Sequence, residues 1–398
     1  MSIIDISNVD IVYGKGPQAA LKLLDQGQQS TTIKEATGHT IAVQGVNVSI
    51  NRGEIFVIMG LSGSGKSTLL RAINGLERIS RGQIDITVNN EENRPARYSM
   101  VDADDATLQN LRTHHISMVF QNFALFPWKT VAKNVAFGLE IARKQRGLIE
   151  QRVKHCLELV GLLSYSERYP SELSGAMQQM VGLARALATD ADIILMDEPF
   201  SALAPLIKKR LHDELLKLQR DLYKTIVFIT HDLDEALKLG SRIAIMQDGK
   251  IVQIGRSEEI IRYPKTSFVR DFVAHVDQTK VLRARAIMTS LADLTVNPTD
   301  SSVVLDPSKN VRCLLDNGGR PRRSLCGDVA GRIVPWTLYQ SGRFTEHDIV
   351  LGNEHLMIKD LIDTIGRTKK PMVIKDRAGK MIGAVTSESI LNALSLKS

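Results

Sequence analysis

The stretch that most constrains this chain is residues 60–67, Gly-Leu-Ser-Gly-Ser-Gly-Lys-Ser. An apolar run at 55–59 precedes it and predicts a buried strand, while residues 68–73 predict the first turns of a helix. Glycines allow successive backbone amides to face one anion, and the helix N-terminus adds partial positive charge. This arrangement predicts a site for nucleoside triphosphate phosphates; the alternative is a glycine-rich turn that matches by chance.

The expected cofactors are ATP and Mg²⁺. A lysine in such a loop reaches the β- and γ-phosphates, and the serine after it can ligate Mg²⁺. The residues of this stretch predicted to contact ATP are Gly60, Leu61, Ser62, Gly63, Ser64, Gly65, Lys66, Ser67 and Thr68.

Buried strands alternate with helices after the loop, which predicts an α/β fold with a mainly parallel sheet. A chain of 398 residues suggests two domains, with three as the alternative. We expect the first over residues 1–278, with a helical insertion at about 14–38 between strands, and an edge strand at 4–12. Glycine, proline and arginine become denser from about residue 280, so the second domain is expected over 279–398. There, residues 357–394 predict a helix–strand–strand–helix unit.

Three further strand ends carry polar side chains. Asp197 and Glu198 follow a buried apolar strand, and Gln121 and His231 each follow another. Ligand crevices form at the carboxyl edge of such sheets. We expect Asp197 to hold Mg²⁺, Glu198 to polarise the attacking water, Gln121 to touch the metal or the water, and His231 to contact the γ-phosphate. The alternatives are helix-capping carboxylates and loop side chains without a role.

Residues 173–179, Leu-Ser-Gly-Ala-Met-Gln-Gln, resemble the signature motif of ATP-binding cassette (ABC) proteins. The order of all five motifs matches that family over residues from about 4 to 275. The resemblance implies a P-loop NTPase with a helical subdomain and a head-to-tail dimer with a second copy. In it, the signature residues complete the ATP site of the opposite subunit, which here would be Ser174, Gly175, Ala176 and Gln178.

Residues 53–61, 118–121, 229–236 and 243–246 look like the glycine betaine/proline/choline uptake class, and residues 12–24 resemble its choline transport ATPases in particular. The C-terminal unit resembles one half of a paired cystathionine-β-synthase (CBS) type regulatory domain. The resemblance implies an ATPase that energises import of a quaternary ammonium solute. Its partners would be an integral-membrane permease and, indirectly, an extracytoplasmic binding protein, with the chain on the cytoplasmic face of the inner membrane.

The chain departs from the family at three positions: Ala176 replaces a glycine, Met180 an arginine and Ala204 an aspartate. Ala176 adds a Cβ where a backbone approaches phosphate, and Met180 removes a hydrogen-bonding guanidinium. We expect a working but slow ATPase. The alternatives are an ATP-binding sensing module with weak turnover, and a soluble ABC ATPase that acts on nucleic acid or the ribosome and not in transport.

Three surface features complete the expectations. The side chain expected to stack on adenine is Tyr13 or His39; the alternative is that these side chains only pack against the protein. Residues 122–130, which are rich in aromatic side chains, look like the surface that receives the permease. The basic cluster at 320–323 suits anionic lipid, with an ordinary solvated loop as the alternative.

The bulk composition sets broader limits. The net charge of +7 permits anionic partners without proving any, and no nucleic-acid partner is expected. Three scattered cysteines suit a reducing cytoplasm. No apolar run approaches the roughly 20 residues of a membrane span, and no signal peptide is visible at the N-terminus.

Overall fold

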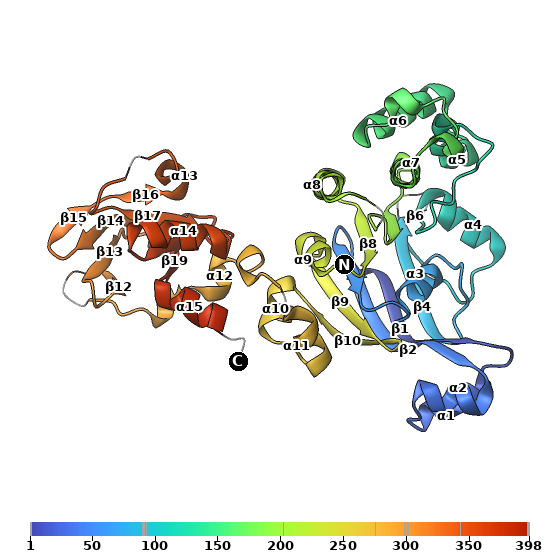
Figure 1. Ribbon diagram of the computed structural model, residues 1–398, viewed down its shortest axis with the longest axis horizontal. Helices are drawn as coiled ribbons and strands as arrows, with labels where there is room; N and C mark the ends of the chain where they lie inside the picture. The colour runs from blue at the N-terminus through green and yellow to red at the C-terminus, as the bar shows by residue number, and fades with distance from the viewer. Residues whose placement is uncertain are drawn as a thin grey trace. The chain divides into compact units, whose positions relative to one another are not determined.

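The computed structural model describes residues 2–395 apart from 90–91, 93, 202, 275, 298–299, 301 and 343. Contacts divide the chain into two compact units, one of Met1–Ile260 with Lys265–Val269 and one of Ile261–Pro264 with Arg270–Ser398. The division therefore falls near residues 260–270, whereas the sequence placed a boundary at 278. Figure 1 shows the elements of each unit.

The first unit is built on a six-stranded sheet in the order β10-β9-β3-β8-β7-β6. Its strands are β3 (Ile55–Met59), β6 (Ile116–Val119), β7 (Ile193–Asp197), β8 (Thr225–Thr230), β9 (Arg242–Gln247) and β10 (Lys250–Gly255). Every pair is parallel except β9 with β10. All residues of β3, β7 and β8 are buried, as expected for central parallel strands covered on both faces. The predicted mainly parallel sheet is confirmed.

A four-stranded antiparallel sheet packs beside it in the order β2-β1-β4-β5. Its strands are β1 (Ser2–Tyr13), β2 (Thr40–Asn51), β4 (Arg81–Asn89) and β5 (Pro95–Ser99). The prediction of an edge strand at residues 4–12 is wrong, because β1 lies between β2 and β4. Alternating apolar residues indicate that one face of a strand is buried, but they do not indicate whether one or two other strands pair with it. One hydrophobic core joins the two sheets, with Ile4 and Ile86 in the same cluster as Phe56.

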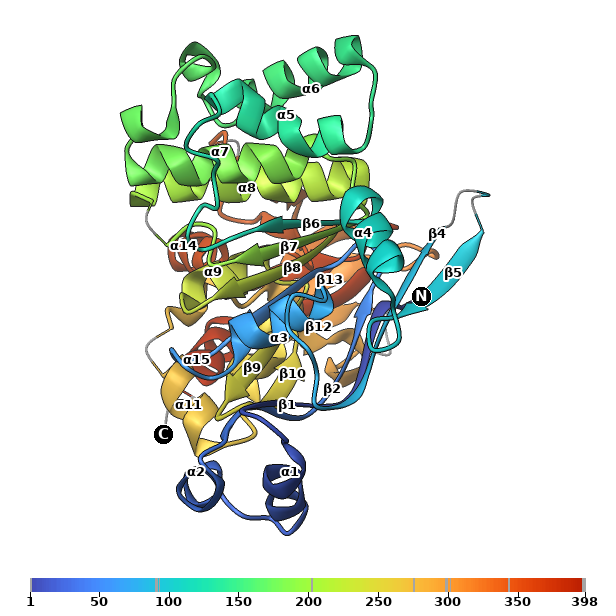
Figure 2. The same cartoon turned by 90° about the vertical axis from the view of Figure 1, so that its right-hand side faces the viewer.

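Helix α3 (Lys66–Ile73) follows the phosphate loop, and its Leu69 and Leu70 belong to that core. Figure 2 shows the helical subdomain beyond the β6 side of the large sheet, where α5, α6 and α7 gather with α8 beneath them. Further helices lie between successive strands of this unit. Two more follow its last strand, and each of these two contains residues of both units. Their bounds are α4 (Asp105–His114), α5 (Val131–Ile141), α6 (Arg146–Leu159), α7 (Gly175–Ala188), α8 (Pro205–Leu222), α9 (Leu233–Leu239), α10 (Ser257–Arg262) and α11 (Ser267–Val273), with short 3₁₀ turns at Leu163–Tyr165 and Pro170–Glu172.

Two helices, α1 (Gln18–Asp25) and α2 (Ser30–Thr37), interrupt the chain between β1 and β2. Their Ala20 and Ile33 are buried against Val12 and Ile41, which forms a small separate core. Arg81 on β4 ties the insertion down: its Nε donates to buried Asp10 at 2.6 Å, and its Nη1 donates to Asp25 at 2.7 Å. These two hydrogen bonds raise the pKa of Arg81.

The second unit contains two sheets. One has the order β11-β19-β18-β17-β16, and the other is the meander β12-β13-β14-β15. Its strands are β11 (Thr289–Ser290), β12 (Val303–Asp306), β13 (Val311–Leu315), β14 (Pro321–Cys326), β15 (Val329–Gly331), β16 (Ile333–Pro335), β17 (Ile349–Asn353), β18 (Met372–Lys375) and β19 (Met381–Val385). Its helices are α12 (Ala284–Ile287), α13 (Trp336–Tyr339), α14 (Ile358–Thr368) and α15 (Ser387–Ser395), with 3₁₀ turns at Gln278–Lys280 and Leu291–Asp293.

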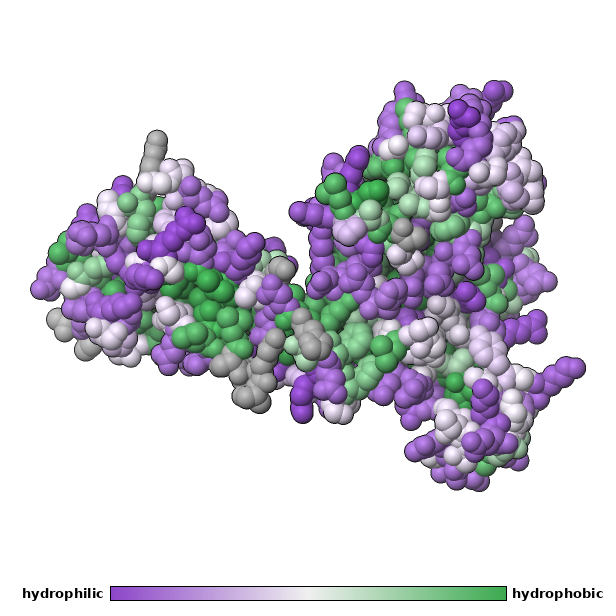
Figure 3. Space-filling model, viewed as in Figure 1, coloured by the Kyte–Doolittle hydropathy of each residue, from purple (hydrophilic) through white to green (hydrophobic). Residues whose placement is uncertain are grey.

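The order α14-β18-β19-α15 confirms the predicted helix–strand–strand–helix unit. Arg322 and Arg323 of the basic cluster are exposed on strand β14 and so do not lie in a loop. Figure 3 shows a largely hydrophilic surface on each unit, with hydrophobic side chains gathered at α8 and at α15. Leu206, which is 81% exposed, and Leu391, which is 66% exposed, contribute there.

We predict that Arg81→Met lowers the free energy of unfolding by about 2 kcal/mol, because buried Asp10 loses a charged donor while the guanidinium itself remains partly solvated. Urea denaturation followed by circular dichroism measures this. The control is Arg146→Met, which breaks an ion pair with Glu150 on a side chain that is 93% exposed. Equal midpoints for both variants would contradict the stabilising role of the Arg81 contact with buried Asp10.

Candidate nucleotide site

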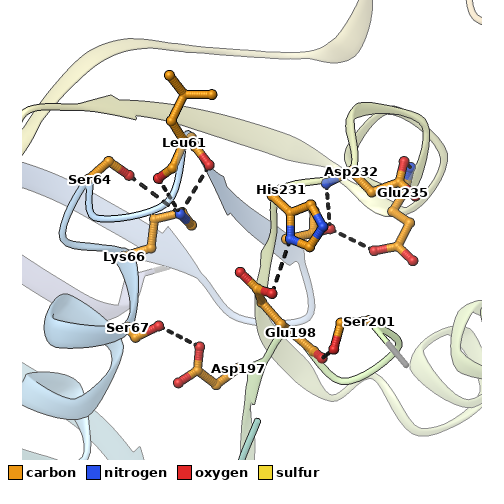
Figure 4. Close-up of polar contacts among 12 residues, drawn as sticks. Leu61, Ser64, Lys66, Ser67, Asp197, Glu198, Ser201, His231, Asp232 and Glu235 are labelled. Atoms are coloured by element: carbon orange, nitrogen blue, oxygen red, sulfur yellow. Dashed lines mark hydrogen bonds and ion pairs between the residues drawn. The ribbon is translucent and has the colours of Figure 1, made fainter. Parts of the chain in front are cut away.

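The register of the parallel strands β3, β7 and β8 brings together the polar residues that follow them. Met59 of β3 pairs with Thr230 of β8, and Asp197 of β7 pairs with Ile229 of β8. The residues that follow these strands therefore emerge at one edge of the sheet. Figure 4 shows Lys66, Ser67, Glu198 and His231 facing this edge.

Close backbone packing explains the glycines of the loop. A Cβ on Gly60 would lie 2.1 Å from the carbonyl oxygen of Met246, and one on Gly65 would lie 2.1 Å from that of Ala42. Gly65 also has φ +95°, in the region that favours glycine. The loop is therefore wedged between β2 and β9, which fixes the N-terminus of α3 beneath it.

Lys66 lies inside the loop and is 5% exposed. Its Nζ donates to the carbonyl oxygens of Gly60 at 3.0 Å and Leu61 at 2.8 Å. Burial lowers its pKa, and the negative charges of Glu198 and Asp197 oppose that shift. The ammonium is thus held among oxygen acceptors, where an anion's oxygens can replace the loop carbonyls.

Asp197 ends β7 and is 1% exposed. Its Oδ1 accepts from Ser67 Oγ at 2.7 Å. Its Oδ2 is buried and accepts no hydrogen bond from the described residues, and Arg71 Nη2 lies 3.7 Å away. Burial raises the pKa of Asp197, although Ser67 and Arg71 act against the shift.

A hydroxyl beside a carboxylate with one oxygen that accepts no hydrogen bond from the described residues fits a hard cation such as Mg²⁺. Within the described residues there is no group of three or more His, Cys, Asp or Glu side chains that could hold a metal by itself. Mg²⁺ is usually held by one or two carboxylates together with substrate phosphates and water, and Asp197 offers one such carboxylate.

Glu198 and His231 form a pair at the same edge. Glu198 Oε2 lies 3.0 Å from His231 Nδ1, and the two side chains are 16% and 60% exposed. Glu198 has φ +47°, an uncommon conformation for a residue with a Cβ. A half-buried carboxylate beside an accessible imidazole can orient a water molecule and exchange a proton with it.

Gln121 is exposed just beyond β6. Among the described residues, no hydrogen bond joins its side chain to Ser67, Asp197 or Glu198. Strand β6 pairs with β7 with Val119 opposite Met196, so Gln121 follows the strand next to the one that ends at Asp197.

The two adenine candidates differ in their contacts. Tyr13 is 41% exposed, and its hydroxyl lies 3.2 Å from Thr68 Oγ1 on α3 and 3.2 Å from Glu77. His39 Nε2 lies 3.0 Å from the carbonyl oxygen of Lys15, and a Cβ on Gly14 would lie 2.3 Å from the His39 ring. Tyr13 thus touches the phosphate-loop helix, whereas His39 packs at the root of the insertion.

The signature residues begin α7. Ser174 caps this helix, with its Oγ accepting from the Met177 amide at 3.3 Å, and Ser174 and Gly175 are exposed. Ala176 is partly exposed, and Gln178 Nε2 donates to the carbonyl oxygen of Pro170 at 2.9 Å. No hydrogen bond or ion pair in the described part of the chain joins them to its own phosphate loop.

Residues 122–130 are held by two side chains from the helical subdomain. Asn134, fully buried on α5, exchanges hydrogen bonds with the backbone of Phe126 at 2.8 and 3.1 Å. Arg185 on α7 donates to the carbonyl oxygen of Ala124 at 2.6 Å. Trp128 remains 71% exposed. Side chains of the helical subdomain therefore hold the loop in place, while Trp128 faces outward.

Sequence reasoning missed two residues here. Arg71 lies four positions after Ser67, so the i,i+4 spacing on α3 could have placed it beside the same carboxylate. Gln179 Nε2 donates to the carbonyl oxygen of Glu198 at 3.2 Å. Nothing in the sequence indicated that contact, because the two residues come from separate elements.

Comparisons with known proteins agree with this geometry. The family described as ABC transporter matches residues 43–201. The glycine betaine/carnitine transport ATP-binding protein GbuA of Listeria monocytogenes serotype 1/2a (strain 10403S) is 39% identical over 399 residues, 99% of this chain and 98% of that protein. The glycine betaine/proline betaine transport system ATP-binding protein ProV of Escherichia coli (strain K12) is 46% identical over 284 residues, 71% of this chain and 69% of that protein.

Among solved structures, the dimeric post-hydrolysis state of the ATP-binding cassette MJ0796 bound to ADP and Pi superposes with a TM-score of 0.53 at 31% identity, covering 64% of this chain and 99% of that one. Fold and site together define an ATP-binding cassette ATPase. The chain belongs to the ATP-binding proteins of ABC transporters, which bind ATP and couple its hydrolysis to transport. The predicted resemblance to their glycine betaine/proline/choline class is confirmed.

In the part of the chain that the structure describes, no helix has both the length and the apolar character needed to cross a bilayer.

We predict that Asp197→Asn weakens Mg²⁺-dependent ATP binding at least about tenfold, because the amide keeps the shape but loses the anionic oxygens. The same variant is expected to unfold at the same or a higher temperature at pH 7.5, since burial makes the ionised carboxylate costly. This advantage shrinks as the pH falls through the raised pKa of the folded state. It is lost below 3.8, the ordinary pKa of the group, where the wild-type carboxyl is protonated in both folded and unfolded states.

Titrations with a fluorescent ATP analogue, with Mg²⁺ and with EDTA, measure the first effect, and calorimetric melts measure the second. An Asn variant with unchanged Mg²⁺ dependence would contradict the assignment.

Proposed function

We propose that this chain hydrolyses ATP to energise import of a quaternary ammonium compatible solute, of the choline, glycine betaine or proline class, through a membrane permease. The observation that carries the proposal is the Glu198–His231 pair beside Lys66 and the buried Asp197, at one edge of the sheet. The solute class is supported by GbuA and ProV, whose names state glycine betaine transport.

Ser67 and Asp197 would hold Mg²⁺, and Gln121, which follows the neighbouring strand β6, would contact the cation or the attacking water. When bound, the cation would neutralise developing charge on the phosphates. Lys66 binds the β- and γ-phosphates in place of the loop carbonyls that it now contacts. Glu198 orients the attacking water and accepts its proton, while His231 donates to the γ-phosphate oxygen.

Two copies complete each site. Ser174 and Gly175 are exposed at the start of α7, where a helix N-terminus favours an anion. We propose that they, with Ala176 and Gln178, contact the ATP held by the opposite subunit. The MJ0796 cassette is described as dimeric, which supports this arrangement.

Residues 122–130 are the proposed contact with the permease, since Trp128 is exposed on a loop that Asn134 and Arg185 hold in place. An extracytoplasmic binding protein would deliver the solute, and the chain would sit on the cytoplasmic face of the inner membrane. No nucleic acid is required by this function.

Ala176, Met180 and Ala204 differ from the family's usual residues, but none of them is a proposed catalytic residue at the end of a strand. Met180 is buried, and Ala204 precedes α8 without a side-chain cap; Ala202 of the same loop lies outside the described residues. We propose that turnover persists at a reduced rate. The alternative of a sensing module with weak turnover predicts phosphate release at background level even with the permease present, and a non-transport ATPase would not copurify with a permease.

We propose that the second unit is a CBS-like regulatory domain. The α14-β18-β19-α15 order supports it, as does a cavity of about 730 Å³ in this unit with Lys309, Lys369 and Lys370 along its wall. Exposed Arg320, Arg322 and Arg323 support an additional contact with anionic lipid.

We predict that Glu198→Gln lowers phosphate release at least about 100-fold while ATP binding persists, because the amide cannot accept a proton from water. Rates from the full chain assembled with its permease, and retention of labelled ATP on the same preparation, measure the two effects. Fast turnover in this variant would count against the role of Glu198.

We predict that Tyr13→Ala weakens ATP binding about tenfold through loss of stacking on adenine. The matched control is Tyr165→Ala, a 40% exposed tyrosine on the helical subdomain. His39→Ala tests the other candidate in the same titration with fluorescent ATP, and a larger loss there than in Tyr13→Ala would transfer the adenine contact to His39.

A further inference from the structure

The main chain of Glu198 is held in an uncommon conformation. Its φ of +47° lies in the left-handed region, where a Cβ crowds the backbone. Its amide donates to the carbonyl oxygen of Ile229 on β8 at 3.2 Å. Its own carbonyl oxygen accepts from the amide of Ser201 at 3.3 Å and from Ser201 Oγ at 3.1 Å. These contacts come from the neighbouring strand and from the loop that Glu198 begins.

One contact comes from a different part of the subunit. Gln179 lies in the second turn of α7, and its Nε2 donates to the carbonyl oxygen of Glu198 at 3.2 Å. The residue is 2% exposed, so solvent does not compete for the bond. Its Oε1 is buried and accepts no hydrogen bond from the described residues. A buried amide without a partner is costly, and this bond satisfies the donor half of the Gln179 amide.

The carbonyl and the side chain of Glu198 share one Cα. The Cα also joins the amide, which Ile229 holds, to the carbonyl, which Gln179 and Ser201 hold. Fixing both flanking peptide planes fixes the direction of the Cα–Cβ bond, and with it the position from which the carboxylate reaches His231 at 3.0 Å. A left-handed conformation persists only where surrounding contacts over-determine it. Helix α7 begins at Ser174 and Gly175, so the Gln179 bond joins that helix to the carboxylate of the same subunit.

We propose that Gln179 is a positioning residue for hydrolysis. It holds the Glu198 main chain in the conformation that aims the carboxylate at the attacking water, and it ties that conformation to the helix whose first residues face the partner's ATP. This inference rests on the proposed role of Glu198.

The test compares two glutamine-to-methionine variants of the full chain. Gln179→Met keeps the length of the side chain and removes the donor. Gln219→Met is the matched control, because Gln219 Nε2 also donates to a main-chain carbonyl, that of Gly53, at the end of β3 away from the phosphate loop. We expect kcat to fall about fivefold in Gln179→Met with KM for ATP unchanged, and both constants to stay within about twofold of wild type in Gln219→Met.

A second variant, Gln179→Glu, separates positioning from packing. A carboxylate cannot donate to the Glu198 carbonyl, whereas a protonated carboxyl can. Its kcat relative to wild type is expected to rise as the pH falls from 8 to 6, because burial favours the neutral carboxyl. Far-ultraviolet circular dichroism at each pH verifies that the folded fraction is constant. A purely structural role gives a ratio that does not change with pH.

Glu198→Gln, measured alongside, keeps the two ideas distinguishable. If Glu198→Gln is inactive while Gln179→Met turns over at the wild-type rate, or if Gln219→Met loses as much activity, the positioning role is overturned and the function of Glu198 stands. If Glu198→Gln turns over like wild type, both are overturned.

Discussion

The site depends on parallel pairing among β3, β8 and β7. Met59 pairs with Thr230 and Asp197 with Ile229, so the residues after these strands emerge together. A shift of one residue in any of these strands would turn its side chains to the other face of the sheet. The register is secured by burial of all three strands, and the phosphate loop then fits only because Gly60 and Gly65 have no Cβ against neighbouring carbonyl oxygens.

Burial gives this edge its chemistry. Asp197 has one oxygen satisfied by Ser67 and one left without a hydrogen bond, and Lys66 is held on loop carbonyls with a lowered pKa. Burial makes the charged form of each group less stable than it would be in water. Bound phosphates would compensate the buried charge of Lys66, and a bound cation would compensate that of Asp197. This edge therefore favours a charged ligand over an apolar one.

Helix α7 connects three parts of the subunit. Ser174 at its start is exposed, Gln179 in its second turn reaches the Glu198 carbonyl, and Arg185 near its end holds the carbonyl of Ala124 in the loop after Gln121. One rigid element therefore touches the proposed partner site, the proposed catalytic carboxylate and the proposed permease surface. A rigid-body movement of α7 would displace residues at all three places, whereas the movement of a flexible loop would change only its own surroundings.

The sequence by itself determined the phosphate loop, the mainly parallel sheet, the helical subdomain and the strand-end residues, because glycine spacing, buried apolar runs and terminal polar residues are local signals. It also identified the class of protein. It did not reveal that β1 is a central strand or that Tyr13 contacts Thr68. Nor did it show that Gln179 reaches Glu198. Those facts depend on which elements become neighbours, and only the tertiary structure decides this, because such contacts join residues whose local patterns say nothing of each other.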